Sequence, residues 1–260
     1  MSTLELIVLC VLFFLTSIIG VVTGSNSLIT VPAMFLFGID ARVAVATNMF
    51  GLTFMSVGGA LPFVGKGTFD RRRLPALVAL TLVGSIAGAL LVLVVSSRAM
   101  PLFISVSMLA VALFTVATRR DAGVHIEPSA PTRAAEWTAF GATFVLGIYG
   151  GFFSGGYVTL LTAAFVALFR MKFVEAVATT KIVNVFSSLV ATLVFMWYGL
   201  VDYRLGVVLA VVMFAGGFVG ARVALRLNDV WLRRIFLTTV IALALKILLY
   251  DFLWKGMLKG

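Results

Sequence analysis

Long apolar runs, separated by short polar segments, follow one another along the whole chain. A helix that crosses a bilayer needs about 20 mostly apolar residues. Eight runs reach or approach that length, whereas the runs at 28–38 and 157–169 are too short. The pattern predicts an all-α integral membrane protein with about eight full spans and two short or re-entrant helices. The long runs cover residues 4–22, 44–64, 74–95, 100–117, 137–153, 174–198, 205–225 and 231–253.

The two halves of the chain resemble each other at a constant offset, which is the pattern of an internal repeat. Under a shift of 132 residues, glycine, aspartate, threonine and arginine coincide, and near the start of each half the shift is 127. Chance alignment of apolar helices explains repeated hydrophobic letters but not these coincidences, so we favour duplication. The aligned pairs include Thr47 with Thr179, Asp70 with Asp202, Gly84 with Gly216, Gly88 with Gly220, and Ser27 with Ser154.

The distribution of basic residues predicts that the two halves are inverted. If each half crosses the membrane a net odd number of times, thirteen Lys and Arg fall on one face and five on the other. Basic loops also swap between halves: residues 66–73 hold four basic residues and the counterpart 198–205 holds only Arg204. By the positive-inside rule, the thirteen lie in the cytoplasm and both termini lie outside it. We therefore expect a first repeat (1–118), a cytoplasmic linker (119–134) and a second, inverted repeat (135–260).

Composition excludes several classes of protein. The chain is 62% hydrophobic and 12% charged, which rules out a soluble globule. The net charge of +10 fits cytoplasmic loops better than nucleic acid. One cysteine, Cys10, and one histidine, His125 in the linker, leave no intramolecular disulfide and no histidine-rich metal or haem site. We expect no metal, no cofactor and no catalytic residues, and we interpret the first run as a retained helix rather than a signal peptide.

Small polar residues precede both short apolar runs. Such residues cap helix starts or leave the backbone open, and the free N–H groups at a helix start favour an anion. Ordinary capping is the alternative, but the repeat would bring the two starts to one place. The candidate residues are Ser25, Asn26 and Ser27 in the first half, and Ser154, Gly155 and Gly156 in the second.

Lys181 is a cation within an apolar run, which is expensive in a membrane and therefore a functional candidate. Asn184 and Ser188 follow at i+3 and i+7, on the same helical face. The alternative is snorkelling of the lysine to the nearby interface, which we consider the better explanation for Lys246, the other basic residue within such a run. Polar residues at equivalent positions complete the candidate set: Thr47 and Asn48 in the first half, Thr179 and Thr180 in the second.

Acidic residues all lie in loops or near the ends of apolar runs. A proton relay normally uses intramembrane Asp, Glu or His, so the sequence gives little support to proton coupling. An anion inside a cell with a negative interior is driven outward by about 2.3 kcal/mol per charge per 100 mV. Passive efflux driven by the potential would therefore suffice.

Four motifs in order resemble the sulfite exporter TauE/SafE family of bacterial membrane permeases, over nearly the whole chain. They are TGSNSLITVP at 23–32, AVATN at 44–48, GIYGGFF at 147–153 and ATTKIVN at 178–184. The resemblance implies a permease in the bacterial inner membrane that exports sulfite, sulfonates or related sulfur-containing anions.

We therefore expect a secondary transporter that binds a small anion near the midplane between inverted repeats. An anion-selective channel and a transporter of another small anionic metabolite stay open as alternatives. A membrane enzyme ranks far behind, because no catalytic pair or metal cluster is present. The expected partners are the small anion and membrane lipid, with no nucleic acid, and a homodimer is possible.

Overall fold

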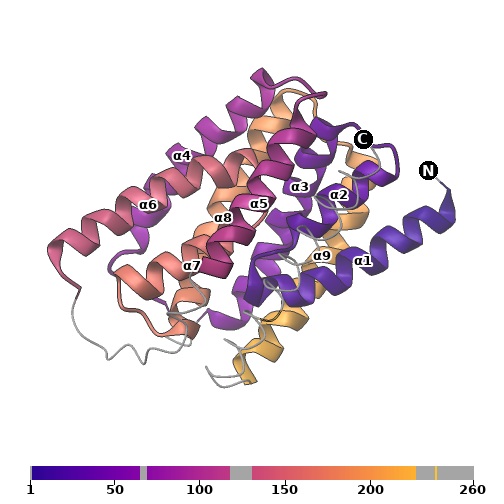
Figure 1. Cartoon of the computed structure of the whole chain (residues 1–260). Helices are drawn as coiled ribbons and strands as arrows, with labels where there is room; N and C mark the ends of the chain where they lie inside the picture. Colours follow the sequence, from indigo (N-terminus) through magenta and orange to yellow (C-terminus); the bar gives the residue numbers. More distant parts are fainter. Residues whose placement is uncertain (1, 65–68, 118–130, 227–237, 239–260) are drawn as a thin grey trace.

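The computed structural model describes residues 2–64, 69–117 and 131–226, together with Thr238. Within these residues the chain forms α-helices, one short 3-10 helix and no strand (Figure 1). The elements are α1 (Thr3–Thr23), α2 (Ser27–Leu36), α3 (Ala41–Ala60), η1 (Leu61–Phe63), α4 (Leu74–Val94), α5 (Met100–Ala117), α6 (Arg133–Phe152), α7 (Tyr157–Leu168), α8 (Phe173–Trp197) and α9 (Tyr203–Arg226).

Five of these helices are long and apolar enough to cross a membrane: α1, α3 continued by η1, α4, α8 and α9. Two other expected spans within the described residues, those in α5 and α6, are not among these five. Helix α6 is less apolar because it contains Glu136 and several glycines. The expected span at 231–253, Lys246 and His125 lie outside the described residues. Five candidate spans are therefore found among the described residues, and the expectation of eight stays a prediction.

Helices α3 and α8 form the centre of the described bundle. In their most apolar stretches 78% and 61% of residues are buried, against 33%, 39% and 44% in α1, α4 and α9. Helix α3 contacts α8 and α9, α8 also contacts α4 and α7, and the pairs α1–α9 and α4–α6 pack on the flanks (Figure 1). First-half and second-half helices therefore interleave.

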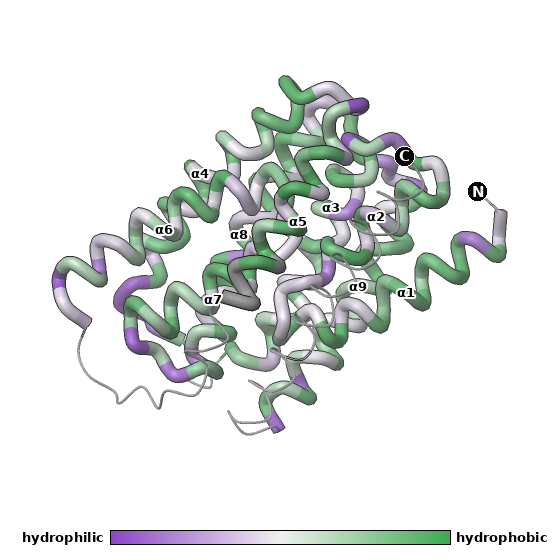
Figure 2. The backbone as a smooth tube through the Cα atoms, viewed as in Figure 1, coloured by the Kyte–Doolittle hydropathy of each residue, from purple (hydrophilic) through white to green (hydrophobic). Residues whose placement is uncertain are grey.

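Many large apolar side chains of the helices are exposed. Along the backbone, hydrophilic residues lie mostly near the helix ends and connections (Figure 2). Exposed aromatic side chains mark several of these ends. Trp137 lies near the start of α6, Trp197 and Tyr198 at the end of α8, and Tyr203 at the start of α9. Aromatic side chains at helix ends are typical of the membrane–water interface, so this surface fits a lipid environment.

Glycines allow the flanking helices to touch backbone to backbone. A methyl group at Gly84 or Gly88 in α4 would overlap the carbonyl oxygens of Phe144 or Ile148 in α6. Gly216 and Gly220 in α9 meet the backbone of α1 in the same way. These stripes of small residues fit close packing of membrane helices.

One ion-pair cluster joins the starts of α4 and α6. The Arg73 guanidinium pairs with Asp70 at 2.6 Å and Glu136 at 2.7 Å, and lies 4.8 Å from the ring centre of Phe169. Burial of the guanidinium tends to lower its pKa, but hydrogen bonds and charge from the two carboxylates outweigh that effect and raise the pKa of Arg73. The cluster ties the α3–α4 connection to the second half of the chain.

Candidate functional site

Both short helices begin inside the protein rather than at its surface. The connection between α1 and α2, residues 24–26, is buried, and so is the connection 153–156 between α6 and α7. Gly24 ends α1 with φ +67°, and Gly156 precedes α7 with φ +80°, a region that residues with a Cβ rarely adopt. Glycine at these two positions therefore allows the chain to turn sharply within the core.

The two helix starts touch each other through serine hydroxyls. Ser27 Oγ lies 2.8 Å from Ser154 Oγ, although the two residues are 127 positions apart. Asn48 in α3 donates its amide to Ser27 Oγ at 2.9 Å, and Thr30 donates to Asn48 Oδ1 at 2.7 Å. The two short helices therefore begin at the same place, as expected, with Ser27 and Ser154 in contact. Asn48 belongs to the same hydrogen-bonded group.

Lys181 in α8 is buried, with 1% of its surface exposed. Its Nζ donates to the carbonyl oxygen of Gly20 at 3.2 Å, within the last turn of α1. The negative end of a helix dipole favours a cation there. The Lys181 side chain therefore does not snorkel to the interface, because its amine points into the bundle.

No carboxylate balances this amine among the described residues. Within the described residues both ion pairs involve Arg73. Lys181 is the one charged side chain in this part of the chain that is buried. An ammonium has three donors, and a buried one is costly unless it is paired and fully hydrogen-bonded. The Lys181 amine therefore has donors left over with which it can bind an anion.

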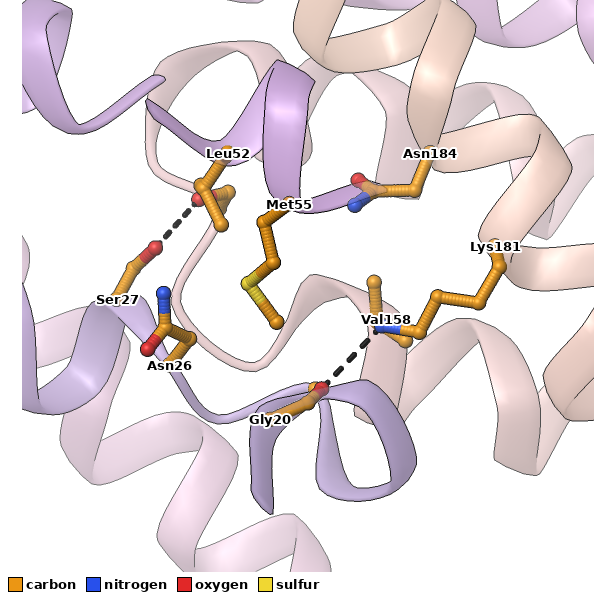
Figure 3. Close-up of a pocket in the computed structure, with 10 residues that line it drawn as sticks. Gly20, Asn26, Ser27, Leu52, Met55, Val158, Lys181 and Asn184 are labelled. Atoms are coloured by element: carbon orange, nitrogen blue, oxygen red, sulfur yellow. Dashed lines mark hydrogen bonds between the residues drawn. The ribbon is translucent and has the colours of Figure 1, made fainter. Parts of the chain in front are cut away.

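A small pocket lies beside Lys181, where the two short helices begin (Figure 3). Its space for water centres is about 10 Å³, enough for about one water molecule. A polyatomic anion does not fit in a space of this size. The pocket is lined by Gly20, Gly24, Asn26, Ser27, Leu52, Met55, Ser154, Val158, Lys181 and Asn184.

Five of the residues expected from the sequence line this pocket: Asn26, Ser27, Ser154, Lys181 and Asn184. Asn184 donates its amide to Ser56 Oγ of α3 at 2.6 Å, which joins α8 to α3 at the pocket wall. The helix-capping interpretation is wrong for Asn26, because its side chain makes no capping hydrogen bond to α2.

The other expected residues do not line the pocket. Ser25 Oγ contacts Thr23 Oγ1 at 2.7 Å, and the Gly155 carbonyl accepts from Tyr149 at 2.5 Å. A side chain at Gly156 would meet Val111. Thr180 contacts Thr162 at 3.0 Å, at the positions equivalent to Asn48 and Thr30.

Thr47 and Thr179 each bind a connection of the opposite half. Thr47 Oγ1 accepts the Asp202 backbone N–H at 3.0 Å, and Thr179 Oγ1 accepts that of Asp70 at 3.3 Å. Both threonines are fully buried. These equivalent hydrogen bonds hold the turns before α4 and α9 against α8 and α3.

Replacing either threonine by valine is expected to lower the free energy of unfolding by about 1 kcal/mol, because a part-buried N–H loses its acceptor. Thermal unfolding of the detergent-solubilised protein measures the change. Thr138, exposed on α6 with its hydroxyl bound to Ala134 of the same helix, is the control, and its valine variant should stay within about 0.5 kcal/mol of the wild type. Unchanged unfolding in both buried variants would contradict the assignment.

The carbonyl of Gly20 and the side chain of Met55 are not among the residues expected from the sequence. No sequence signal marks the backbone carbonyl of a glycine as the partner of a distant lysine. Met55 reads as an ordinary apolar residue of α3. Only the packing of α1 and α3 against α8 brings both to the pocket.

Comparison with known proteins identifies the family of the chain. The sequence profile of the family described as sulfite exporter TauE/SafE matches residues 9–247. The chain belongs to this family. TauE/SafE proteins are membrane transporters by description, and the apolar helices here fit a multi-pass membrane protein.

Curated relatives agree with membership of the TauE/SafE family. The probable membrane transporter protein ORF9 of Sinorhizobium sp is 26% identical over 90% of this chain and 89% of its own length. The probable membrane transporter protein YfcA of Escherichia coli K12 is 26% identical over 94% and 91%. The probable membrane transporter protein YdhB of Bacillus subtilis is 24% identical over 91% and 98%. No solved structure matches the chain.

Proposed function

We propose that this TauE/SafE protein is a secondary transporter that exports a small anion, a sulfur-containing oxyanion such as sulfite or an organosulfonate. The observation that carries the proposal is the buried Lys181 amine, which points toward α1 and has no carboxylate partner among the described residues. An anion in the pocket would supply the missing negative charge. The family description supports a sulfur oxyanion as cargo.

We further propose that the two halves form inverted repeats around this pocket. Pairs of hydrogen bonds at equivalent positions support a two-fold relation: Thr47 with Asp202 and Thr179 with Asp70, each across the halves. Ser27 and Ser154 are equivalent to each other, and a residue that touches its own equivalent lies on the two-fold axis. The swap of basic loops supports an axis in the membrane plane, with both termini outside the cytoplasm.

The tightness of the pocket favours a transporter over an anion-selective channel. With room for about one water molecule, the site must open to admit a polyatomic anion. Rocking of one repeat against the other would open it to each side in turn. A channel with a standing open path is the second candidate, and it would give flux that does not saturate and is much faster.

Flux of a monovalent sulfonate through reconstituted proteoliposomes tests the energy source. None of the described acidic residues is buried, so we expect the membrane potential to drive transport without a pH gradient. One charge moved across 100 mV is worth about 2.3 kcal/mol, which corresponds to about a fiftyfold concentration ratio at equilibrium. Flux that needs a pH gradient and ignores the potential would overturn this mechanism.

A further inference from the structure

The amide of Asn26 is buried beside the pocket without a hydrogen-bond partner. Neither Nδ2 nor Oδ1 has one, although 3% of the residue is exposed. An asparagine before a helix commonly caps it, but this side chain makes no cap bond to α2. Because leaving a buried amide unsatisfied costs stability, an amide in this position points to a ligand that satisfies it.

Gly20 brings Asn26, Met55 and Lys181 to one place. A Cβ at Gly20 would lie 2.9 Å from Asn26 Cβ and 3.1 Å from the methyl group of Met55. The carbonyl of the same residue accepts from Lys181 Nζ at 3.2 Å. Figure 3 draws the Met55 side chain between the Asn26 amide and Lys181. A ligand that displaces the flexible Met55 side chain would therefore meet both polar groups.

The two groups demand different chemistry from that ligand. The Lys181 amine, when protonated, only donates, so it suits the oxygens of an anionic group. The Asn26 amide both donates and accepts, and either orientation of the amide leaves its carbonyl oxygen needing a donor. An anion with acceptors alone would leave that oxygen unpaired.

The repeat supports a site that distinguishes two ends of its ligand. The position equivalent to Asn26 is Phe153, and the position equivalent to Lys181 is Met49. Each polar group therefore occurs once, one in each half. A ligand with an anionic end and a donor end matches this asymmetry.

Building on the proposed function, we propose that the pocket selects anions that also carry an O–H or N–H donor. Lys181 binds the anionic group and Asn26 accepts the hydrogen bond from the donor. Organosulfonates with a hydroxyl or ammonium group, and protonated oxyanions, belong to this class. Anions of equal size and charge without a donor bind more weakly.

Competition against sulfite flux in proteoliposomes tests this selectivity. The probes are 2-hydroxyethanesulfonate and propane-1-sulfonate, monovalent anions in which a hydroxyl and a methyl replace each other. We expect the hydroxylated anion to inhibit at a concentration about tenfold lower, because it alone can donate a buried hydrogen bond to Asn26. Equal inhibition by both, or none by the hydroxylated anion, would overturn the inference.

Variants of Asn26 show whether this residue sets the preference. In Asn26→Leu the ratio of inhibitory concentrations should fall to about one, and Asn26→Ala provides a second variant if the leucine does not fold. Thr81→Val is the control, because Thr81 is buried but does not line the pocket, and it should keep the wild-type ratio. A wild-type ratio in both Asn26 variants would overturn the role of Asn26. If sulfite flux itself were independent of Lys181, the proposed function would fail instead.

Discussion

Replacing Lys181 by methionine is expected to reduce anion flux through proteoliposomes by about a hundredfold. The substitution keeps an unbranched apolar side chain, one heavy atom shorter, and removes the terminal amine. Hydrogen bonds to charged groups contribute about 1.5–3 kcal/mol, and loss of one near the upper end corresponds to this factor. Uptake of sulfite and of a monovalent sulfonate measures the change, normalised to the amount of reconstituted protein.

The same variant should unfold at the wild-type temperature or above it. A buried amine with one hydrogen bond to the Gly20 carbonyl and no carboxylate partner among the described residues contributes little to stability. If flux is lost while the unfolding temperature is unchanged, Lys181 is needed for binding the anion and not for folding. Thermal unfolding in detergent therefore separates the two roles.

Lys172 provides the matched control for charge. It is exposed immediately before α8, so Lys172→Met should leave flux within about twofold of the wild type. Lys181→Arg keeps the positive charge, although the larger guanidinium has less room beside the small pocket. Because the charge is kept, this variant should retain more flux than the methionine variant. Wild-type flux in Lys181→Met would refute the assignment of Lys181 to the anion site.

Among the described glycines, Gly88 is the one whose replacement by alanine is expected to destabilise the protein most. The new methyl would overlap the carbonyl oxygen of Ile148 and lie 2.7 Å from the nitrogen of Phe152. Both atoms belong to backbone, so a rotamer change cannot relieve the overlap and α4 must separate from α6. We expect a loss of about 3 kcal/mol, at the upper end of overpacking effects, measured as a fall in unfolding temperature.

Gly141→Ala is the control for this experiment, because Gly141 is also a helical glycine in the α4–α6 pair and nothing lies within 4 Å of an added methyl. Alanine has the higher helix propensity by about 1 kcal/mol, so the control should be neutral or stabilising. Equal unfolding temperatures for the two variants would show that the α4–α6 contact is looser than described.

The helices could be predicted closely because a membrane imposes a simple rule on composition. The runs 4–22, 74–95 and 157–169 correspond to α1 (Thr3–Thr23), α4 (Leu74–Val94) and α7 (Tyr157–Leu168). In lipid every backbone group must be satisfied within its own helix, so an apolar run and a helix coincide. The number of spans was harder to predict, because the glycines and Glu136 that serve contacts of α6 also lower its hydropathy.

The candidate site was predictable where polarity itself was the signal. Lys181, Asn26 and Ser154 stand out in apolar surroundings, and all three line the pocket. Thr47 and Thr179 carry the same signal but bind the backbone of distant connections. Polarity in a membrane helix marks a residue that needs a partner, and it does not say whether that partner is protein or cargo.

By itself, the sequence determined that this is a helical membrane protein with a lysine in an apolar segment, because hydropathy and charge are properties of each residue alone. The tertiary structure decided which atoms meet: the Gly20 carbonyl at Lys181, Met55 in the pocket, and an unpaired amide at Asn26. These contacts depend on how α1, α3 and α8 approach one another. Helix approach is set by glycines and side-chain shapes at distant positions acting together, which no single stretch of sequence contains.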